Sequence, residues 1–167
     1  MSADPSPHPG DIYGHWREHC AELEARYPEQ FAKADLGVSW ADGWHAIVAG
    51  VCAYAAEREI PVRWRQIKEK LGGLRMDAHG GPMPVDISTP EGVIAATPAP
   101  KGPRTNADLY AKIKEAEAAS LRTCCLCGIT NAAADAKQRA FNGWWLTACE
   151  ACAVLIQAYC DLPPSQR

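Results

Sequence analysis

Two C-x-x-C pairs restrict what this chain can fold into more than any other feature of its sequence. Cys124 and Cys127 form the first pair, Cys149 and Cys152 form the second, and residues 128–148 lie between them. This spacing is typical of a structural zinc site, because a short turn directs two thiolates at one ion and two pairs complete a tetrahedron. We therefore expect one Zn²⁺, held by four thiolates at about 2.3 Å, with no position left for a water ligand.

The residues between and after the pairs predict how this segment folds. Gly128 directly follows the second thiol and can adopt the positive φ that ends a tight knuckle. Asn142-Gly143, set between two short apolar runs, predicts a β-hairpin. From Cys149 the composition is helical until Pro163-Pro164. Knuckle, hairpin and helix in this order resemble the treble-clef zinc finger, in which the free N–H groups of the helix N-terminus help to hold thiolates.

Other uses of the cysteines fit the sequence less well. A redox C-x-x-C is expected near a βαβ pattern, and none precedes these pairs. A disulfide framework suits small secreted chains, whereas the eight cysteines here are unevenly spread and residues 1–10 do not read as a signal peptide. Within the knuckle, Cys125 is expected to be a bystander, but a register that uses Cys125 in place of Cys124 stays open.

The chain is predicted to belong to the α+β class, as a small helical domain with a short β element and a C-terminal treble-clef-like finger. Hydrophobic residues make up 47% of the 167, which is enough for a core without disulfides. The expected segments are a disordered N-terminus over 1–10, an α+β core over 11–77, a proline- and glycine-rich loop over 78–104, and a helix plus finger over 105–162, packed on the core.

The first predicted helix runs from Asp11 to Tyr27, where Pro28 ends it. Its apolar residues recur at helical spacing and define one face: Ile12, Trp16, Cys20, Leu23 and Tyr27. His15 and His19 lie close to Cys20 and suggest a metal site at first sight. A pair of surface histidines beside a core-facing cysteine is the favoured interpretation, because no carboxylate is fixed nearby.

A second helix is predicted to begin at Asp42, with Asp42 as its N-cap. The repeat of large apolar residues indicates that most of it is buried: Trp44, Val48, Val51 and Ala55. Cys52 is expected in the core, and His45 as an interior or boundary histidine rather than a ligand.

The segment from Pro61 to Met76 carries conflicting signals. Ile60, Trp64, Ile67 and Leu71 follow a helical spacing, whereas Gly72-Gly73 allows two strands folded back on each other. We expect an extended start, a helical turn over Lys68–Leu71, a glycine reversal and a short strand from Leu74. The side chains expected in the core are Ile67, Leu71 and Leu74, and those expected at least partly in solvent are Lys68, Lys70 and Arg75.

The stretch from Ala78 to Arg104 contains six prolines and is expected to be a mobile loop that is dispensable for folding. Within it, Val85-Asp86-Ile87 and Val93-Ile94 are candidates for a small edge hairpin. A third helix is predicted to begin at the N-cap pair Thr105-Asn106 and to lead into the knuckle. Its buried face is expected to consist of Leu109, Ile113, Ala116 and Ser120.

Several motifs together resemble a group of small proteins encoded by phages and prophages. They are Gly43-Trp44-x-x-Ile47 with Val51-Cys52, the run Gln66-Ile67-Lys68-Glu69-Lys70-Leu71-Gly72-Gly73-Leu74-Arg75, the helix end Ala116–Ser120, the knuckle Thr123–Gly128 and the closing segment Trp144–Cys152. The chain departs from that pattern at Leu71, at Met76-Asp77 and in the length of the loop after Ala78. The resemblance implies an architecture and a phage or mobile-element context, and it implies no reaction.

The function expected first is that of a non-enzymatic zinc-binding interaction protein in the cytoplasm. The net charge of −3 does not indicate a nucleic-acid or membrane partner. No apolar run approaches the length of a membrane span. The five histidines form no recognisable motif with a carboxylate, so a nuclease, or a thiol enzyme using Cys125 or Cys160, is not expected. The expected partner is a host or phage protein, and an inhibitor of a bacterial defence system is one concrete form.

The alternative is a nucleic-acid-binding zinc finger. A basic stretch interleaved with Trp64 would contact phosphates and stack a base, and its candidate residues are Arg63, Arg65, Lys68, Lys70 and Arg75. In the contrasting interpretation, these long side chains cover the edge of the core and pair with neighbouring glutamates.

Overall fold

The computed structural model describes residues 8–32, 37–79, 86–89, 92–95, 107–130 and 135–167. Its helices are α1 (Trp16–Arg26), α2 (Pro28–Phe31), α3 (His45–Glu57), α4 (Ala107–Ser120) and α5 (Glu150–Cys160), with the 3₁₀ turns η1 (Asp42–Trp44) and η3 (Pro164–Gln166). Its strands form three antiparallel pairs: β1 (Trp64–Lys70) with β2 (Gly73–Ala78), β3 (Asp86–Thr89) with β4 (Gly92–Ala95), and β5 (Lys137–Phe141) with β6 (Trp144–Ala148). The chain has the predicted α+β class.

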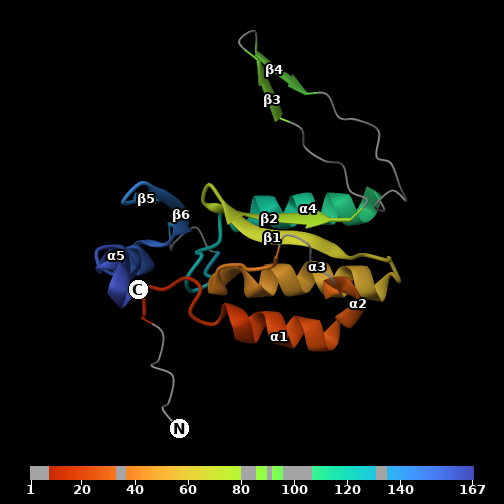
Figure 1. The fold of residues 1–167 in the computed structure, drawn as a ribbon, viewed down its shortest axis with the longest axis horizontal. Coiled ribbons are helices and arrows are strands. Elements are labelled where there is room, and N and C mark those ends of the chain that lie inside the picture. The colour runs from red at the N-terminus through yellow and green to blue at the C-terminus, as the bar shows by residue number, and fades with distance from the viewer. Residues whose placement is uncertain (1–7, 33–36, 80–85, 90–91, 96–106, 131–134) are drawn as a thin grey trace.

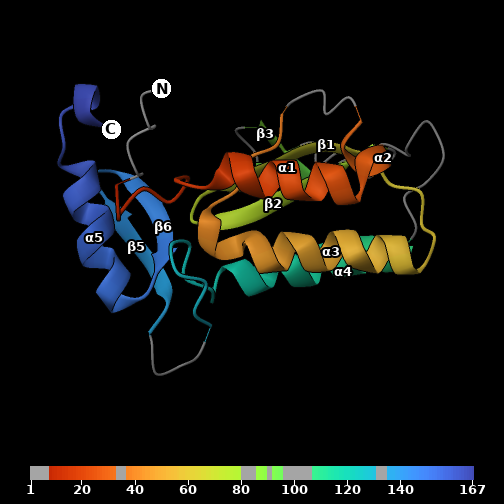
Figure 2. The same ribbon diagram turned by 90° about the horizontal axis from the view of Figure 1, so that it is seen from below.

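Two groups of elements make up the body of the molecule. Helices α1, α3 and α4 lie alongside the β1–β2 pair, and β5, β6 and α5 lie together at one end of that assembly (Figures 1 and 2). We call the described residues from 123 to 160 the cysteine finger. None of the helices in the described part of the chain has both the length and the apolar character that a membrane crossing requires.

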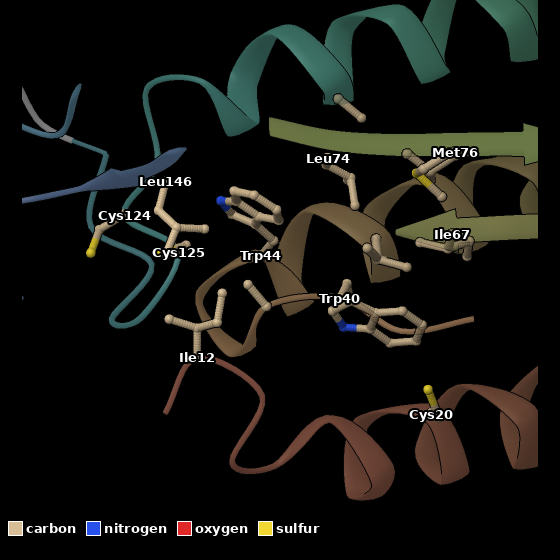
Figure 3. Packing of buried hydrophobic residues seen from close by; sticks show 14 of the residues in the cluster. Ile12, Cys20, Trp40, Trp44, Ile67, Leu74, Met76, Cys124, Cys125 and Leu146 are labelled. Carbon is tan, nitrogen blue, oxygen red and sulfur yellow. The ribbon is translucent and has the colours of Figure 1, made fainter. Parts of the chain in front are cut away.

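Three tryptophans occupy the centre of the core. Trp40, Trp44 and Trp64 are all fully buried, and each buries roughly 150–250 Å² of surface. Figure 3 shows the same cluster continuing from Cys20 on α1 to Leu146 on β6. Trp44 also donates from Nε1 to the carbonyl oxygen of Thr123 at 3.0 Å, so the core includes the start of the cysteine finger.

The first helix begins later than the sequence predicts, at Trp16 rather than Asp11. The Asp11 carboxylate accepts a hydrogen bond from the N–H of Tyr13 at 2.9 Å, which holds this stretch in a turn. The Asp42 carboxylate accepts from the N–H of His15 at 3.0 and 3.1 Å. The prediction that Asp42 caps its own helix is therefore wrong, since neither η1 nor α3 has a side-chain cap and Asp42 instead binds the start of α1.

The prediction of a helical turn over Lys68–Leu71 is also wrong, because β1 continues as a strand through Lys70. The pairing register shifts between Trp64 and Gln66, which leaves Arg65 as an extra residue in a β-bulge. Because of this extra residue, Trp64 and Ile67 face the core although they are three positions apart. The bulge therefore produces a spacing of three positions between buried residues, which in the sequence is also typical of a helix.

The turn between β1 and β2 exposes a residue that the sequence predicts to be in the core. Leu71 and Gly72 lie between the paired residues Lys70 and Gly73, with φ of 53° and 83°. Two positive φ values are typical of the tightest hairpin turn, in which the turn side chains leave the sheet. Leu71 is 71% exposed, so its prediction as a core residue is wrong, whereas Ile67 and Leu74 are buried as predicted.

Both outer edges of the β1–β2 pair are covered by other parts of the chain. On the β2 edge, the N–H of Leu74 donates to Ser120 Oγ at 2.8 Å and that of Met76 to Glu117 Oε1 at 3.1 Å. On the β1 edge, the N–H of Ser39 donates to the carbonyl of Ile67 at 2.9 Å. A two-stranded sheet therefore leaves few backbone groups unpaired.

The proline-rich stretch contains the predicted small hairpin, as β3 and β4 pair with Ile87 opposite Ile94. The rest of that stretch from residue 80, the predicted N-cap at 105–106 and the first seven residues lie outside the described residues. Helix α4 buries the predicted face, which consists of Leu109, Ile113, Ala116 and Ser120.

Candidate metal centre

Four thiols from two separate segments meet in the cysteine finger. The sulfur atoms of Cys124, Cys127, Cys149 and Cys152 all lie within 4.8 Å of one another, and Cys127 Sγ and Cys149 Sγ are 3.8 Å apart. Three of these side chains are buried and Cys127 is exposed. The pairs that the sequence singles out are thus brought together at one point.

The first pair is held by a tight knuckle that follows α4. The N–H of Cys124 donates to the carbonyl of Ile129 at 3.0 Å, and the N–H of Gly128 donates back to the carbonyl of Cys124 at 2.9 Å. Gly128 has a φ of 74°, which glycine adopts without steric cost. The turn thereby fixes the direction of both thiols.

The second pair is positioned by the β5–β6 hairpin and the start of α5. Phe141 pairs with Trp144 across the two-residue turn Asn142-Gly143, as the sequence predicts. The hairpin returns the chain to the knuckle, where Cys149 is the N-cap residue of α5 and Cys152 lies in its first turn. The arrangement of knuckle, hairpin and helix follows the predicted order.

The environment of Cys149 favours its thiolate. Burial raises the pKa of the Cys149 thiol, but hydrogen bonds from the Cys152 backbone and from the thiols of Cys152, Cys124 and Cys127 outweigh it. The pKa of Cys149 therefore falls below its ordinary value. Burial raises the pKa of the Cys127 and Cys152 thiols, so a bound cation would be needed to keep all four cysteines in the thiolate form that a metal ligand requires.

Cys125 is not part of the cluster, although it neighbours Cys124. Its side chain is fully buried in the core, and Figure 3 shows it beside Leu146. Its N–H donates to the carbonyl of Thr147, and its carbonyl accepts from the N–H of Gly43, both at 2.8 Å. Burial raises the pKa of the Cys125 thiol, so it stays protonated. The register that the sequence left open is thus the one with Cys124.

The remaining cysteines, Cys20, Cys52 and Cys160, are also buried thiols of the core. Burial raises the pKa of Cys20 and Cys52 to about 12, which keeps both protonated at neutral pH. Their buried positions agree with the prediction that they are structural residues. Among the described residues, only the four clustered cysteines combine thiol ligands at mutual binding distance.

The donor set determines what the cluster can do. Four thiolates are soft ligands that select soft or borderline metals, and they fill a tetrahedral coordination shell. A filled shell leaves no position for a substrate or a water molecule. The geometry therefore fits a metal ion that stabilises the fold rather than one that takes part in a reaction.

The cysteine finger is joined to the core by a short connected set of contacts. Thr147 Oγ1 donates to the carbonyl of Gly72 at 2.6 Å, and Gly72 forms a parallel bridge with Leu146. Trp144 Nε1 donates to Glu69 Oε2 at 3.0 Å. The tip of the β1–β2 hairpin thus packs directly against β6.

The basic residues predicted as a nucleic-acid strip only partly share a surface. Lys68 and Arg75 are paired across β1 and β2, and Lys70 is on the same face of the strand as Lys68. Arg65 is the bulge residue, and its Nη2 lies 3.6 Å from Asp77 Oδ2. Arg63 precedes β1 and is exposed. Three of the five candidates therefore share one face.

The stacking ring proposed for that strip does not exist. Trp64 is fully buried, and its Nε1 donates to Gln30 Oε1 at 3.3 Å. The prediction that Trp64 stacks on a base is wrong, because the strand register turns this ring toward the core.

Two exposed apolar residues at the junction of finger and core were missed at the sequence level. Leu71 is 71% exposed and Trp145 is 50% exposed. Leu71 precedes Gly72 and Trp145 precedes Leu146, so the parallel Gly72–Leu146 bridge brings the backbones of the two residues close together. The alternation of a β-strand could have identified Trp145. When two tryptophans follow each other on a strand, their side chains point to opposite faces, so one of them faces outward.

Comparison of the chain with protein-family models, with curated proteins and with solved structures found no match. The resemblance of the Gln66–Arg75 run to small phage-encoded proteins stays a prediction. What this centre can bind follows from its own residues and their geometry.

Proposed function

We propose that the cysteine finger binds one Zn²⁺ as a structural ion. Support comes from the donor set, which consists of four cysteines and no carboxylate, and from the spacing of the pairs, which is typical of structural zinc. Zn²⁺ accepts a tetrahedral thiolate shell without redox chemistry. The ion would cross-link the knuckle to α5 and contribute to the folding free energy of the finger.

Elemental analysis of protein purified without chelator tests the identity of the ion. The expected result is one zinc per chain in the wild type, none in Cys152→Ser, and one in Cys20→Ser, which serves as a matched control outside the cluster. A zinc content near zero, iron as the main metal, or full zinc in Cys152→Ser would each contradict the proposal.

We further propose that the chain is not an enzyme and acts by binding another protein. The observation behind this is the exposed pair Leu71 and Trp145 at the junction of finger and core. Tryptophan is among the residues that contribute most to binding energy in protein interfaces, where it becomes buried against the partner.

A third apolar side chain extends this pair. Leu121, 44% exposed, lies so close to the hairpin that its Cδ2 is 2.8 Å from where a Cβ on Gly73 would stand. Leu71 and Leu121 line a shallow groove of about 420 Å³ together with Lys70 and Lys114. We call Leu71, Leu121 and Trp145 the junction surface, and a partner that covers it would remove all three from water.

The nature of the partner is inferred from the resemblance to phage-encoded proteins. We propose that the chain belongs to a phage or another mobile element, works in the bacterial cytoplasm, and binds a host or phage protein. Inhibition of a bacterial defence system is the specific form that we favour, because occupying another protein needs an interface and no catalytic group.

Affinity capture from a bacterial lysate tests partner binding through the junction surface. The wild-type chain is expected to retain a specific protein that the double variant Leu71→Ala, Trp145→Ala loses. The control is Tyr110→Ala, which removes a side chain of similar exposure (40%) on α4. The proposal fails if the wild type captures nothing above background, or if the double variant captures the same protein as well as the control does.

Nucleic-acid binding is the second candidate, and one observation favours it. Lys68, Lys70 and Arg75 share one face of the β1–β2 pair, where their charges would lie along a phosphate backbone. Fluorescence anisotropy with single- and double-stranded DNA and RNA should then give an affinity that falls steeply with salt. The substitution Lys68→Ala with Lys70→Ala should reduce that salt dependence, and binding that is insensitive to salt would exclude this candidate.

A further inference from the structure

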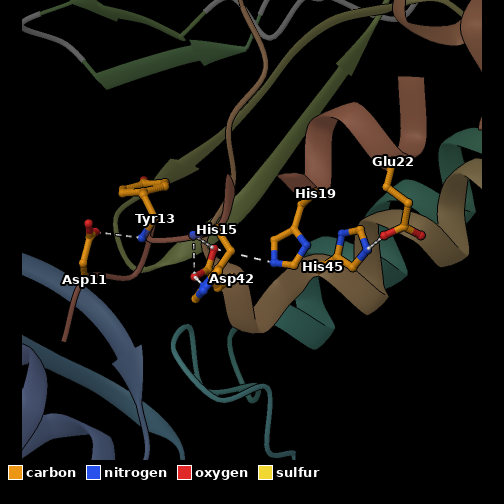
Figure 4. A network of polar contacts seen from close by, with 7 residues as sticks. All are labelled: Asp11, Tyr13, His15, His19, Glu22, Asp42 and His45. Atoms are coloured by element: carbon orange, nitrogen blue, oxygen red, sulfur yellow. Dashed lines mark hydrogen bonds and ion pairs between the residues drawn. The ribbon is translucent and has the colours of Figure 1, made fainter. Parts of the chain in front are cut away.

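A second group of potential metal ligands lies between α1 and the start of α3. Figure 4 shows His15, His19 and Glu22 from α1 and its N-cap facing Asp42 of η1 and His45, the first residue of α3. The sequence offered the two histidines of α1 without an assigned carboxylate. The fold supplies two carboxylates and a third imidazole.

The distances within this group are short. One ring nitrogen of His19, one ring nitrogen of His45 and one carboxylate oxygen of Glu22 all lie within 4.8 Å of one another. His45 Nε2 is 3.0 Å from Glu22 Oε2, and His19 Nε2 is 3.6 Å from Asp42 Oδ1. The His19 and His45 rings are stacked, with their centroids 4.0 Å apart.

The backbone holds these groups on regular elements. His19 and Glu22 are three residues apart on α1, which places them on one face of the helix. Asp42 is oriented by the two hydrogen bonds that it accepts from the N–H of His15, and by its contact of 2.9 Å with His15 Nδ1. The backbone thus places the ligands, and the stacked rings of His19 and His45 would rotate about their side-chain torsions so that their in-plane lone pairs converge on one ion.

The imidazole rings supply nitrogen donors to this group. Among the described atoms, His45 Nδ1 is buried and has no hydrogen-bond partner. Two imidazoles and the Glu22 carboxylate form an N/O donor set, in contrast to the thiols of the finger.

We propose that His19, His45 and Glu22 bind a divalent transition-metal ion, with Asp42 outside the ligand set, where it orients His19. Imidazole ligands select Zn²⁺, Ni²⁺, Co²⁺ or Cu²⁺ over Mg²⁺ and Ca²⁺, which prefer oxygen alone. Glu22 is 55% exposed, whereas the side chains of His19 and His45 are 24% and 20% exposed. The ion would therefore be reachable from solvent and exchangeable, and it would tie α1 to α3.

Zinc titration of the full chain, with its finger already loaded, tests this second site. Calorimetry should show uptake of a further equivalent of Zn²⁺ with a dissociation constant in the micromolar range. The imidazole ¹⁵N resonances of His19 and His45 should shift in the same titration. These resonances report on the histidine site directly, so their response is independent of whether the finger itself holds zinc.

Two variants and one control make the outcome decisive. The two single variants are Glu22→Gln, which keeps the size of an exposed side chain, and His19→Gln. Each should weaken the second site by at least about tenfold. His8→Gln changes a histidine outside this group, whose ring is tilted against that of Tyr159 with the centroids 5.4 Å apart, and this variant should bind as the wild type does. The proposal is overturned if the His19 and His45 resonances do not respond to Zn²⁺, or if Glu22→Gln binds the second equivalent as tightly as His8→Gln. Should His19→Gln fail to fold, Glu22→Gln decides alone.

Discussion

At the scale of single residues, Gly43 sets how closely the core can approach the knuckle. A Cβ on Gly43 would stand 2.2 Å from the carbonyl oxygen of Cys124 and 2.6 Å from the backbone nitrogen of Gly128. These are backbone atoms, so they cannot move aside as the end of a flexible side chain can. The absence of a side chain at Gly43 is thus a condition for the hydrogen bond between its N–H and the carbonyl of Cys125.

We predict that Gly43→Ala destabilises the protein by about 1–3 kcal/mol or more, because the added methyl group overpacks the junction. Gly50→Ala on α3 is the matched control, since a Cβ there meets no atom within 4 Å. It should leave stability unchanged or raise it by up to about 1 kcal/mol, as alanine is the better helix residue. Urea unfolding of the metal-loaded proteins measures both, and equal stability of the two variants would contradict the prediction.

The turn of the β1–β2 hairpin gives a second comparison between residues of one type. Leu74 is 3% exposed and Leu71 is 71% exposed, although the two residues are only three positions apart in the sequence. Leu74→Ala should cost about 2–5 kcal/mol, because it removes buried apolar volume from the core. Leu71→Ala should change the free energy of unfolding by no more than about 0.5 kcal/mol, which denaturant unfolding can resolve. A loss of several kcal/mol from Leu71→Ala would show that this side chain packs against the protein.

At the scale of elements, helix α4 completes the hydrogen bonding of β2. Ser120 Oγ accepts from the N–H of Leu74 at 2.8 Å and donates to the carbonyl of Glu117 at 2.6 Å. The helix therefore acts as the missing neighbour of an edge strand, through side chains rather than through a backbone ladder. Such coverage also keeps the edge from pairing with another chain.

Ser120→Ala should destabilise the protein by about 1–3 kcal/mol, because it leaves the buried N–H of Leu74 without an acceptor. Glu115→Ala on the same helix is the control, since Glu115 is 70% exposed and pairs with Lys112 on the surface. Its effect should stay within about 0.5 kcal/mol. Thermal unfolding of the two variants under identical metal loading compares them, and equal melting temperatures would refute the role of Ser120.

At the scale of the whole molecule, the cysteine finger and the core share one continuous set of buried residues. Trp44 donates a hydrogen bond to the carbonyl of Thr123, and Cys125 lies in the core while Cys124 belongs to the cluster of four cysteines. A loss of the bound ion should therefore be felt first in the knuckle and in β5–β6, and then at the end of α4 that leads into the knuckle. Helix α3 has its own buried face of Val48, Val51, Cys52 and Ala55 and should be affected last.

Hydrogen exchange on Cys152→Ser checks this order. The amides of Cys124 and Gly128, which are hydrogen-bonded within the knuckle, are expected to lose protection, as is the amide of Cys125, which donates to Thr147 on β6. Amides of α3 are expected to stay protected, and the melting temperature should fall. Uniform loss of protection across α3 and the finger would instead show that the chain unfolds as one unit without the ion.

The sequence determined the features that depend on neighbours along the chain. The two cysteine pairs, the turn at Asn142-Gly143 and the helix from Glu150 are set by local spacing, turn chemistry and composition, and they appear as predicted. The buried face of α4 follows from helical periodicity in the same way. In each case the determining contacts reach only a few residues.

Tertiary structure alone decided the features that depend on distant partners. The bulge at Arg65 gave a strand the spacing of a helix, so only pairing with β2 could distinguish the two. Asp42 binds the start of α1 instead of its own helix, and His45 meets Glu22 across 23 positions of the chain. A carboxylate or an imidazole can satisfy many local partners, and which one it reaches is set by how the helices pack. That packing is a long-range property, and no local pattern in the sequence contains it.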